Sequence, residues 1–137
     1  MSQKLAKVLG IVFVIIGVLG FIPNPIVGGS GMFEANALHN LVHIVIGVIL
    51  IMMAKKEDGA RRWLKIFGIV YLLVAILGFL AVGSDGMGNV LGLIAVNSAD
   101  NWLHVILGVI LLGLSFSGGK GMPSMPSGMN NGPRPQM

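Results

Sequence analysis

The sequence predicts an all-α fold, namely a four-transmembrane-helix bundle built from two parallel repeats of a helical hairpin. Three observations support this prediction: four long apolar segments, an uneven distribution of charge and an internal repeat. Only 10% of the 137 residues are charged and 55% are hydrophobic, whereas a soluble domain carries about 25% charged residues. We therefore expect one membrane-embedded domain. The chain has no cysteine, which excludes disulfides, thiolate metal ligands and cysteine nucleophiles.

The four apolar segments comprise residues 5–22, 38–54, 63–82 and 99–116. A helix that crosses a bilayer needs roughly 20 mostly apolar residues, with a range of about 17–25, so each segment is expected to span the membrane. Lys4 stands just before the first segment and Lys7 at its start, as basic residues stand before the core of a signal peptide. It is longer than such a core, however, and no small-residue cleavage site comes after it. We expect it to remain in the protein as a helix.

The basic residues lie on one side of the predicted bundle. All nine precede the first segment, lie in or next to the connection between the second and third, or follow the fourth: Lys4, Lys7, Lys55, Lys56, Arg61, Arg62, Lys65, Lys120 and Arg134. The acids Glu34, Asp85 and Asp100 lie in or near the other two connections. By the positive-inside rule, this predicts a multi-pass protein of the plasma membrane with both termini in the cytoplasm. Because the bilayer accounts for the basic residues, we expect no nucleic acid as a partner.

The second half of the chain repeats the first. Two pairs of aligned segments carry the repeat: residues 10–21 with 68–79, identical at six of twelve positions, and 36–50 with 97–111, identical at seven of fifteen. Each repeat, about residues 8–54 and 66–116, contains two spans. Both repeats therefore enter the membrane from the same side, and we expect them to be parallel and related by an axis along the membrane normal.

Small residues recur on one face of the first and third segments. They stand at corresponding positions of the two repeats: Gly10, Gly17 and Gly20 in the first, and Gly68, Ala75 and Gly78 in the second. A face of small residues lets another helix approach closely in lipid, where packing replaces the hydrophobic effect. We therefore expect a close helix contact along this face in each repeat.

A polar motif begins the second and fourth segments. Its shared members stand at i, i+4, i+7 and i+11: Asn36, Asn40, His43 and Gly47 in the first copy, and Asn97, Asn101, His104 and Gly108 in the second. In a helix these positions share a strip roughly 60° wide, and His39, replaced by Asp100 in the second copy, widens it to about 100°. Polar side chains within a span are costly unless they are paired. We therefore expect the second and fourth spans to meet around Asn40, His43, Asn101 and His104.

The signature N-x-x-[H/D]-N-x-x-H-x-x-x-G resembles that of a bacterial family of small four-helix membrane proteins, catalogued only as a domain of unknown function. The resemblance covers nearly all of residues 5–116 and excludes the tail. The residues that match best are Asn36, His39, Asn40, His43 and Gly47, and the second copy departs from the pattern at Asp100. The resemblance implies the four-span architecture. It implies no activity, because none is assigned to the family.

Our main functional prediction is an interhelical network of hydrogen bonds that fixes the helices against one another. Its members are Asn36, Asn40, His43, Asn97, Asn101 and His104, and Asp100 is expected to pair with His39 across the pseudo-twofold axis. The chain would then be a non-enzymatic structural or accessory subunit with the lipid bilayer as a partner, either alone, as a homo-oligomer or in a larger membrane complex. The absence of G-x-S-x-G, P-loop and H-E-x-x-H motifs also argues against an enzyme.

The alternative is a protein that binds a metal or haem. His39, His43, Asp100 and His104 form two i, i+4 pairs, and three imidazoles with one carboxylate suit Zn, Fe, Cu or Ni. His43 and His104 alone could instead ligate one haem, with Gly47 and Gly108 leaving room for the ring. A path for protons is a third hypothesis, since histidine relays protons, but no polar residue continues such a path toward the cytoplasm. The sequence itself identifies no cofactor.

The chain is expected to divide into two parts. Residues 1–116 form the four-helix membrane domain. Residues 117–137 are rich in Gly, Pro and Met and are predicted to be a disordered cytoplasmic tail, because such a composition does not bury enough apolar surface to offset the entropy of ordering.

Overall fold

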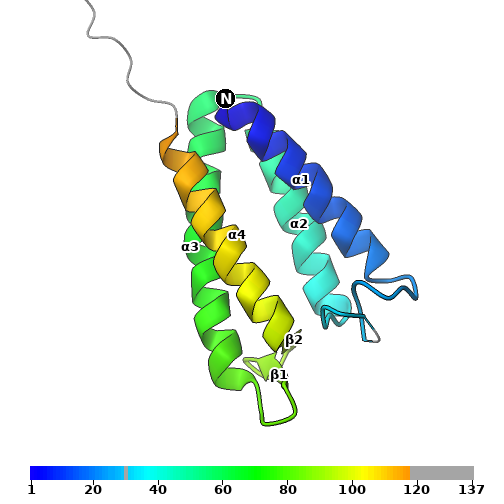
Figure 1. The fold of residues 1–137 in the computed structure, drawn as a ribbon. Helices are drawn as coiled ribbons and strands as arrows, with labels where there is room; N and C mark the ends of the chain where they lie inside the picture. Colours follow the sequence, from blue (N-terminus) through cyan, green and yellow to red (C-terminus); the bar gives the residue numbers. More distant parts are fainter. Residues whose placement is uncertain (30, 118–137) are drawn as a thin grey trace, which may run out of the picture.

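The computed structural model describes residues 1–29 and 31–117. Within them lie four helices, as predicted, and two short strands (Figure 1): α1 (Ser2–Leu19), α2 (Ala37–Met53), α3 (Glu57–Ala81), β1 (Met87–Val90), β2 (Ile94–Asn97) and α4 (Ser98–Phe116). The fold is therefore mostly helical, and the prediction of an all-α fold omits one β-hairpin. The predicted tail lies outside the described residues, except for its first residue.

The β-hairpin lies between α3 and α4, at the end of the bundle opposite the N-terminus (Figure 1). Its strands are antiparallel, with Met87 opposite Asn97 and Val90 opposite Ile94. Val90 and Val96 are buried against the rest of the chain. This apolar stretch is too short to show the alternation of a longer strand, which is why the sequence alone did not predict it.

The helices form two helical hairpins. α1 packs chiefly against α2, and α3 against α4 (Figure 1). The expectation that α2 and α4 pack against each other along the motif is therefore wrong for the helices as a whole. The reason is that α2 and α4 each pack a motif glycine, Gly47 or Gly108, against the small-residue face of the other helix in the same hairpin. Between the two hairpins, α2 and α4 therefore make contact only through long side chains.

The two helices of each hairpin approach most closely at paired glycines. A methyl group added at Gly10 would lie 2.7 Å from the carbonyl oxygen of Gly47, and one added at Gly47 would lie 2.5 Å from that of Gly10. In the second hairpin, a methyl group at Gly68 or Gly108 would lie 3.1 Å from the carbonyl oxygen of the other. The partner backbone thus fills the space of a side chain, which is the close contact that the small residues predict.

Large apolar side chains cover the outside of the helices. Leu80 is 79% exposed, Val109 59% and Val8 58%. A surface of this kind is rare on soluble monomers and fits the hydrocarbon of a bilayer. α1, α3 and α4 are long and apolar enough to cross a membrane, whereas α2 is an apolar helix of 17 residues. These features indicate a membrane protein.

The two helical hairpins are also connected at the end that holds the N-terminus. The α-amino group of Met1 lies 3.5 Å from Glu57 Oε2, and the backbone N–H of Ser2 donates to Glu57 Oε1 at 3.3 Å. The side-chain amide of Gln3 donates to the carbonyl oxygen of Lys55 at 2.9 Å. These contacts hold the start of α1 against the start of α3 and the connection that precedes it.

Candidate functional site

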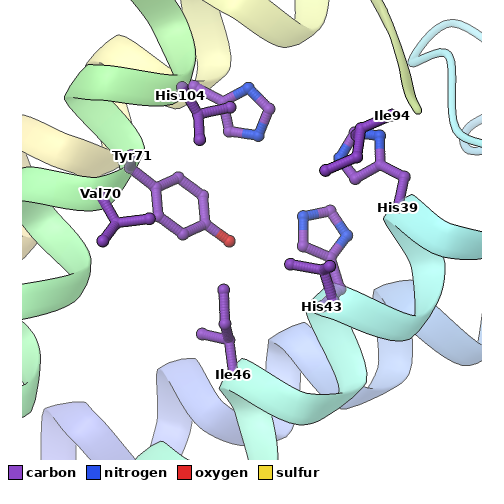
Figure 2. Close-up of a pocket in the computed structure, with 9 residues that line it drawn as sticks. His39, His43, Ile46, Val70, Tyr71, Ile94 and His104 are labelled. Atoms are coloured by element: carbon purple, nitrogen blue, oxygen red, sulfur yellow. The ribbon is translucent and has the colours of Figure 1, made fainter. Parts of the chain in front are cut away.

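Three histidines meet between the two helical hairpins. His39 and His43 lie one turn apart on α2, and His104 belongs to α4. Each offers one ring nitrogen, and these three nitrogens lie within 4.8 Å of one another. His39 and His104 are buried, and His43 is half-buried. Figure 2 shows the three rings around one pocket, which also contains Tyr71 and is called the histidine pocket below.

The orientation of His39 is fixed by one of its two ring nitrogens. Nδ1 lies 2.8 Å from the carbonyl oxygen of Ala95 in β2. A carbonyl oxygen only accepts hydrogen bonds, so Nδ1 carries the hydrogen and Nε2 presents a lone pair. Histidines that bind metals commonly donate their other N–H to a carbonyl or carboxylate in this way, which fixes the ring. The β-hairpin therefore prepares His39 to act as a ligand.

Several polar atoms of the histidine pocket are buried without a hydrogen-bond partner among the described residues. They are Nδ1 of His43, Nδ1 of His104 and the hydroxyl of Tyr71. Buried polar groups are nearly always paired, because an unpaired one loses its bonds to water without compensation. Figure 2 shows the Tyr71 hydroxyl directed into the pocket from α3. An occupant of the pocket would supply the missing partner.

Each of the four helices contributes a ring to the site. Phe13 of α1 stacks on His43 of α2, with ring centroids 5.9 Å apart, and on Tyr71 of α3, at 5.5 Å. The ring of Tyr71 lies 5.1 Å from that of His104 on α4. Between the histidines, the ring of His39 lies 4.7 Å from that of His43 and 5.8 Å from that of His104. The packed rings hold the polar groups at defined positions.

Two small cavities border the histidines. One, of about 50 Å³, is the histidine pocket, and the other, of about 90 Å³, lies on the side of Phe13 and Leu107. Pockets for drug-sized ligands measure about 300–1,000 Å³, and a porphyrin needs a space of that order. The haem alternative therefore does not fit this structure. A space of about 50 Å³ holds an ion and a water molecule, since a water occupies about 30 Å³ of liquid.

Asp100 lines the larger cavity together with the three histidines, but, in contrast to the prediction, its carboxylate is not hydrogen-bonded to His39. Its carboxylate accepts from the backbone N–H of Asn97 at 3.0 Å, while the Asn97 side chain accepts from the backbone N–H of Asp100 at 2.9 Å. This reciprocal pair is a capping box, which satisfies two backbone donors at the start of α4. Oδ2 of the carboxylate is thus used for capping, and the group whose ligand atoms converge consists of the three histidines without Asp100.

Asn36 and Asn97 connect the two helical hairpins as well as capping their helices. The Asn36 side chain accepts from His39 N at 3.0 Å and donates to the carbonyl oxygen of Leu93 at 2.7 Å. Asn97 donates in the same way to the carbonyl oxygen of Met32 at 2.9 Å. Each cap residue therefore forms a hydrogen bond with the segment that connects the two helices of the other helical hairpin.

Asn40 and Asn101 do not take the place in this network that the sequence suggested. Both are buried, and Oδ1 of each lacks a hydrogen-bond partner among the described residues. A methyl group at Gly20 would collide with the amide of Asn40, and one at Gly78 with the amide of Asn101. The two amides thus pack inside their own helical hairpins, in the notches left by these glycines, instead of bonding between hairpins.

Tyr71 is the pocket residue that the sequence analysis did not identify. It is the only tyrosine of the chain and lies within an apolar segment, where an aromatic ring is unremarkable. The available signal was its alignment with Phe13, since the two residues occupy the same position of the aligned segments 10–21 and 68–79. Tyr71 differs from Phe13 only by its hydroxyl group. Because a buried hydroxyl is costly without a partner, this difference indicates a polar neighbour near position 71.

The three ring nitrogens are close enough to share one metal ion. Bonds from zinc to histidine nitrogen measure about 2.0–2.1 Å, so the ligand atoms of a tetrahedral site lie about 3.3 Å apart. The observed separation of at most 4.8 Å would have to shorten by up to about 1.5 Å for a tetrahedral site of this kind. Three neutral imidazoles suit zinc, copper, iron and nickel. Binding of such an ion would also give the free nitrogens of His43 and His104 a partner.

A family model described as "Domain of unknown function (DUF4383)" matches residues 3–117 of the chain. The matched region contains all four helices, the β-hairpin and the histidine pocket. No curated protein and no solved structure matches the chain.

Proposed function

Because the chain belongs to the DUF4383 family, whose function is unknown, we propose a role from the geometry of its site: a membrane protein that binds one transition-metal ion through His39, His43 and His104. The observation that carries this proposal is the convergence of three ring nitrogens within 4.8 Å. The ligands come from both helical hairpins, so the ion would bridge the two halves of the molecule. The proposal includes no catalytic step.

Two further features of the pocket support a metal over simple packing. The hydrogen bond from His39 Nδ1 to Ala95 leaves Nε2 free to coordinate. The small volume, about 50 Å³, suits an ion better than an organic molecule. Both features are expected of a site that is prepared for a metal ion.

The test is metal binding by the full chain, purified in detergent and stripped with a chelator. Zn²⁺, Cu²⁺, Co²⁺ and Ni²⁺ are added separately, and bound metal is measured by elemental analysis after gel filtration. We expect one ion per chain for at least one metal. His43→Ala and His104→Ala should each weaken binding by more than the about 10–100-fold that loss of an outer-shell partner causes.

Asp100→Asn is the matched control, because Asp100 lies next to the pocket but is used in the capping box. This variant should bind the metal as the native protein does. If Asp100→Asn loses metal binding while the histidine variants retain it, the Asp100 carboxylate is a metal ligand. If the native protein binds none of the four metals, the proposal is overturned.

A second candidate function is a structural or accessory subunit, which is favoured by the reciprocal hydrogen bonds of Asn36 and Asn97. In this case the two helical hairpins are parallel repeats held by a polar network, with both termini at the cytoplasmic face of the plasma membrane. The chain is then non-enzymatic, binds no nucleic acid, and contacts lipid, copies of itself or other membrane subunits. A metal-free protein that His43→Ala merely destabilises would favour this function over the first.

A further inference from the structure

The hydroxyl of Tyr71 is buried at the centre of the bundle without a hydrogen-bond partner among the described residues. Only 3% of the residue is exposed. Its ring packs between Phe13 and His104, with centroids 5.5 Å and 5.1 Å away. Figure 2 shows the oxygen pointing into the histidine pocket from the side opposite His39. An oxygen in this position needs an interaction that the surrounding side chains do not provide.

Packing requires the ring of Tyr71 but not its oxygen. Phe13 occupies the corresponding position in the first helical hairpin, stacks on Tyr71 with an angle of 9° between the rings, and is equally buried. A phenylalanine at position 71 would preserve these stacking contacts and remove the uncompensated burial of a hydroxyl. The oxygen is therefore best explained by what occupies the pocket.

We propose that Tyr71 Oη is a fourth ligand, which converts three imidazoles into a site of three nitrogens and one phenolate oxygen. This inference rests on the proposed metal function and extends it to the class of metal. On coordination the phenolic O–H bond breaks, an oxygen–metal bond forms, and the proton passes to water. A site with imidazole and anionic oxygen ligands suits Cu²⁺, and the phenolate also suits Fe³⁺ as a hard anionic donor.

The experiment uses Cu²⁺ as the probe, added to the metal-free full chain in detergent. A phenolate bound to Cu²⁺ produces a charge-transfer band in the visible range, and excitation in that band enhances phenolate vibrations in the Raman spectrum. Because the chain has one tyrosine, such a signal has a single source. We expect the band in the native protein and its complete loss in Tyr71→Phe, which should still bind one Cu²⁺ per chain.

Phe67→Leu is the matched control, since it changes a buried ring one turn away on α3 without removing an oxygen. It should retain both the copper and the band, and circular dichroism should show the same helix content in all three proteins. Copper bound to the native protein without the band, or an unchanged band in Tyr71→Phe, would refute the role of Tyr71. A native protein that binds no copper would show instead that the histidine site fails, and the Tyr71 ligand with it.

Discussion

His39 and Asp100 occupy corresponding positions, the third residue of α2 and of α4, but their side chains make different hydrogen bonds. The backbone N–H of each donates a hydrogen bond to the side-chain oxygen of the cap asparagine three residues earlier. The Asp100 carboxylate turns back to close the capping box, whereas the His39 ring reaches the carbonyl oxygen of Ala95. This single difference between the motif copies places the third imidazole in the pocket, so the two halves of the site are not equivalent.

The two roles of Asn36 can be separated by substitution. Asn36→Asp keeps an oxygen that caps α2 but loses the N–H that donates to Leu93. Its free energy of unfolding should fall by about 0.5–1.5 kcal/mol, the net value of one hydrogen bond. Asn36→Ala also loses the cap and should cost about 1 kcal/mol more. Unfolding by SDS titration in mixed micelles measures both. No loss in Asn36→Asp would show that the bond to Leu93 contributes nothing, and equal losses for the two variants would show that the cap contributes nothing.

At this scale the sequence predicted some of the site and not the rest. Helical spacing alone placed His39 and His43 on one face, and the aligned motif pointed to His104. The pairing of Asp100 with His39 was mispredicted because spacing does not reveal that the carboxylate caps its own helix. Tyr71 was missed because its burial depends on how α3 meets α1, which is set by packing between distant segments.

Among the elements, the four helices and their pairing into helical hairpins were predictable from apolar length and the repeat, whereas the absence of extensive packing between α2 and α4 was not. Matching polar motifs on α2 and α4 suggested that these helices face each other, but the paired glycines bind each motif helix to its own neighbour. In lipid, helices associate partly through van der Waals packing, and small residues let the two backbones approach closely. The motif side chains of α2 and α4 therefore meet only at the histidines, where His39 and His43 of one hairpin approach His104 of the other.

The paired glycines should tolerate no side chain. Gly47→Ala places a methyl group 2.5 Å from the Gly10 carbonyl oxygen and should destabilise the protein by about 1–3 kcal/mol, as overpacking does. Gly113→Ala, on the same type of helix but with open space around its methyl group, should be neutral or stabilise by up to about 1 kcal/mol. The free energy of unfolding in SDS measures both, and equal effects would contradict the close contact at Gly47.

For the whole molecule, the described basic residues and the β-hairpin lie at opposite ends of the bundle (Figure 1). We expect the basic end to face the cytoplasm. The cysteine-free chain allows a clean test with Lys56→Cys and Ser84→Cys, both at exposed positions. In intact cells a membrane-impermeant maleimide should label position 84 and not position 56. Labelling of position 56 alone would show that the orientation in the membrane is the opposite of the predicted one.

A metal that bridges the helical hairpins should also stabilise the whole fold. Binding to the folded state alone adds about 2.7 kcal/mol when the free metal is 100 times its dissociation constant. The native protein should therefore melt at a higher temperature with the bound metal than without it, as measured by circular dichroism in detergent. His43→Ala should show no such increase. An increase in both proteins would place the stabilising ion elsewhere.

The covalent chain joins the helical hairpins only once, at the short connection between α2 and α3. Contacts at the N-terminal end, bonds from Asn36 and Asn97 at the other end, and the histidine pocket between them hold the same two halves together. A cut at Lys55–Lys56 therefore yields two fragments with complementary surfaces. If the two fragments are co-expressed, we expect them to associate with a dissociation constant that reports directly on this interface, and the proposed metal ion should strengthen the association.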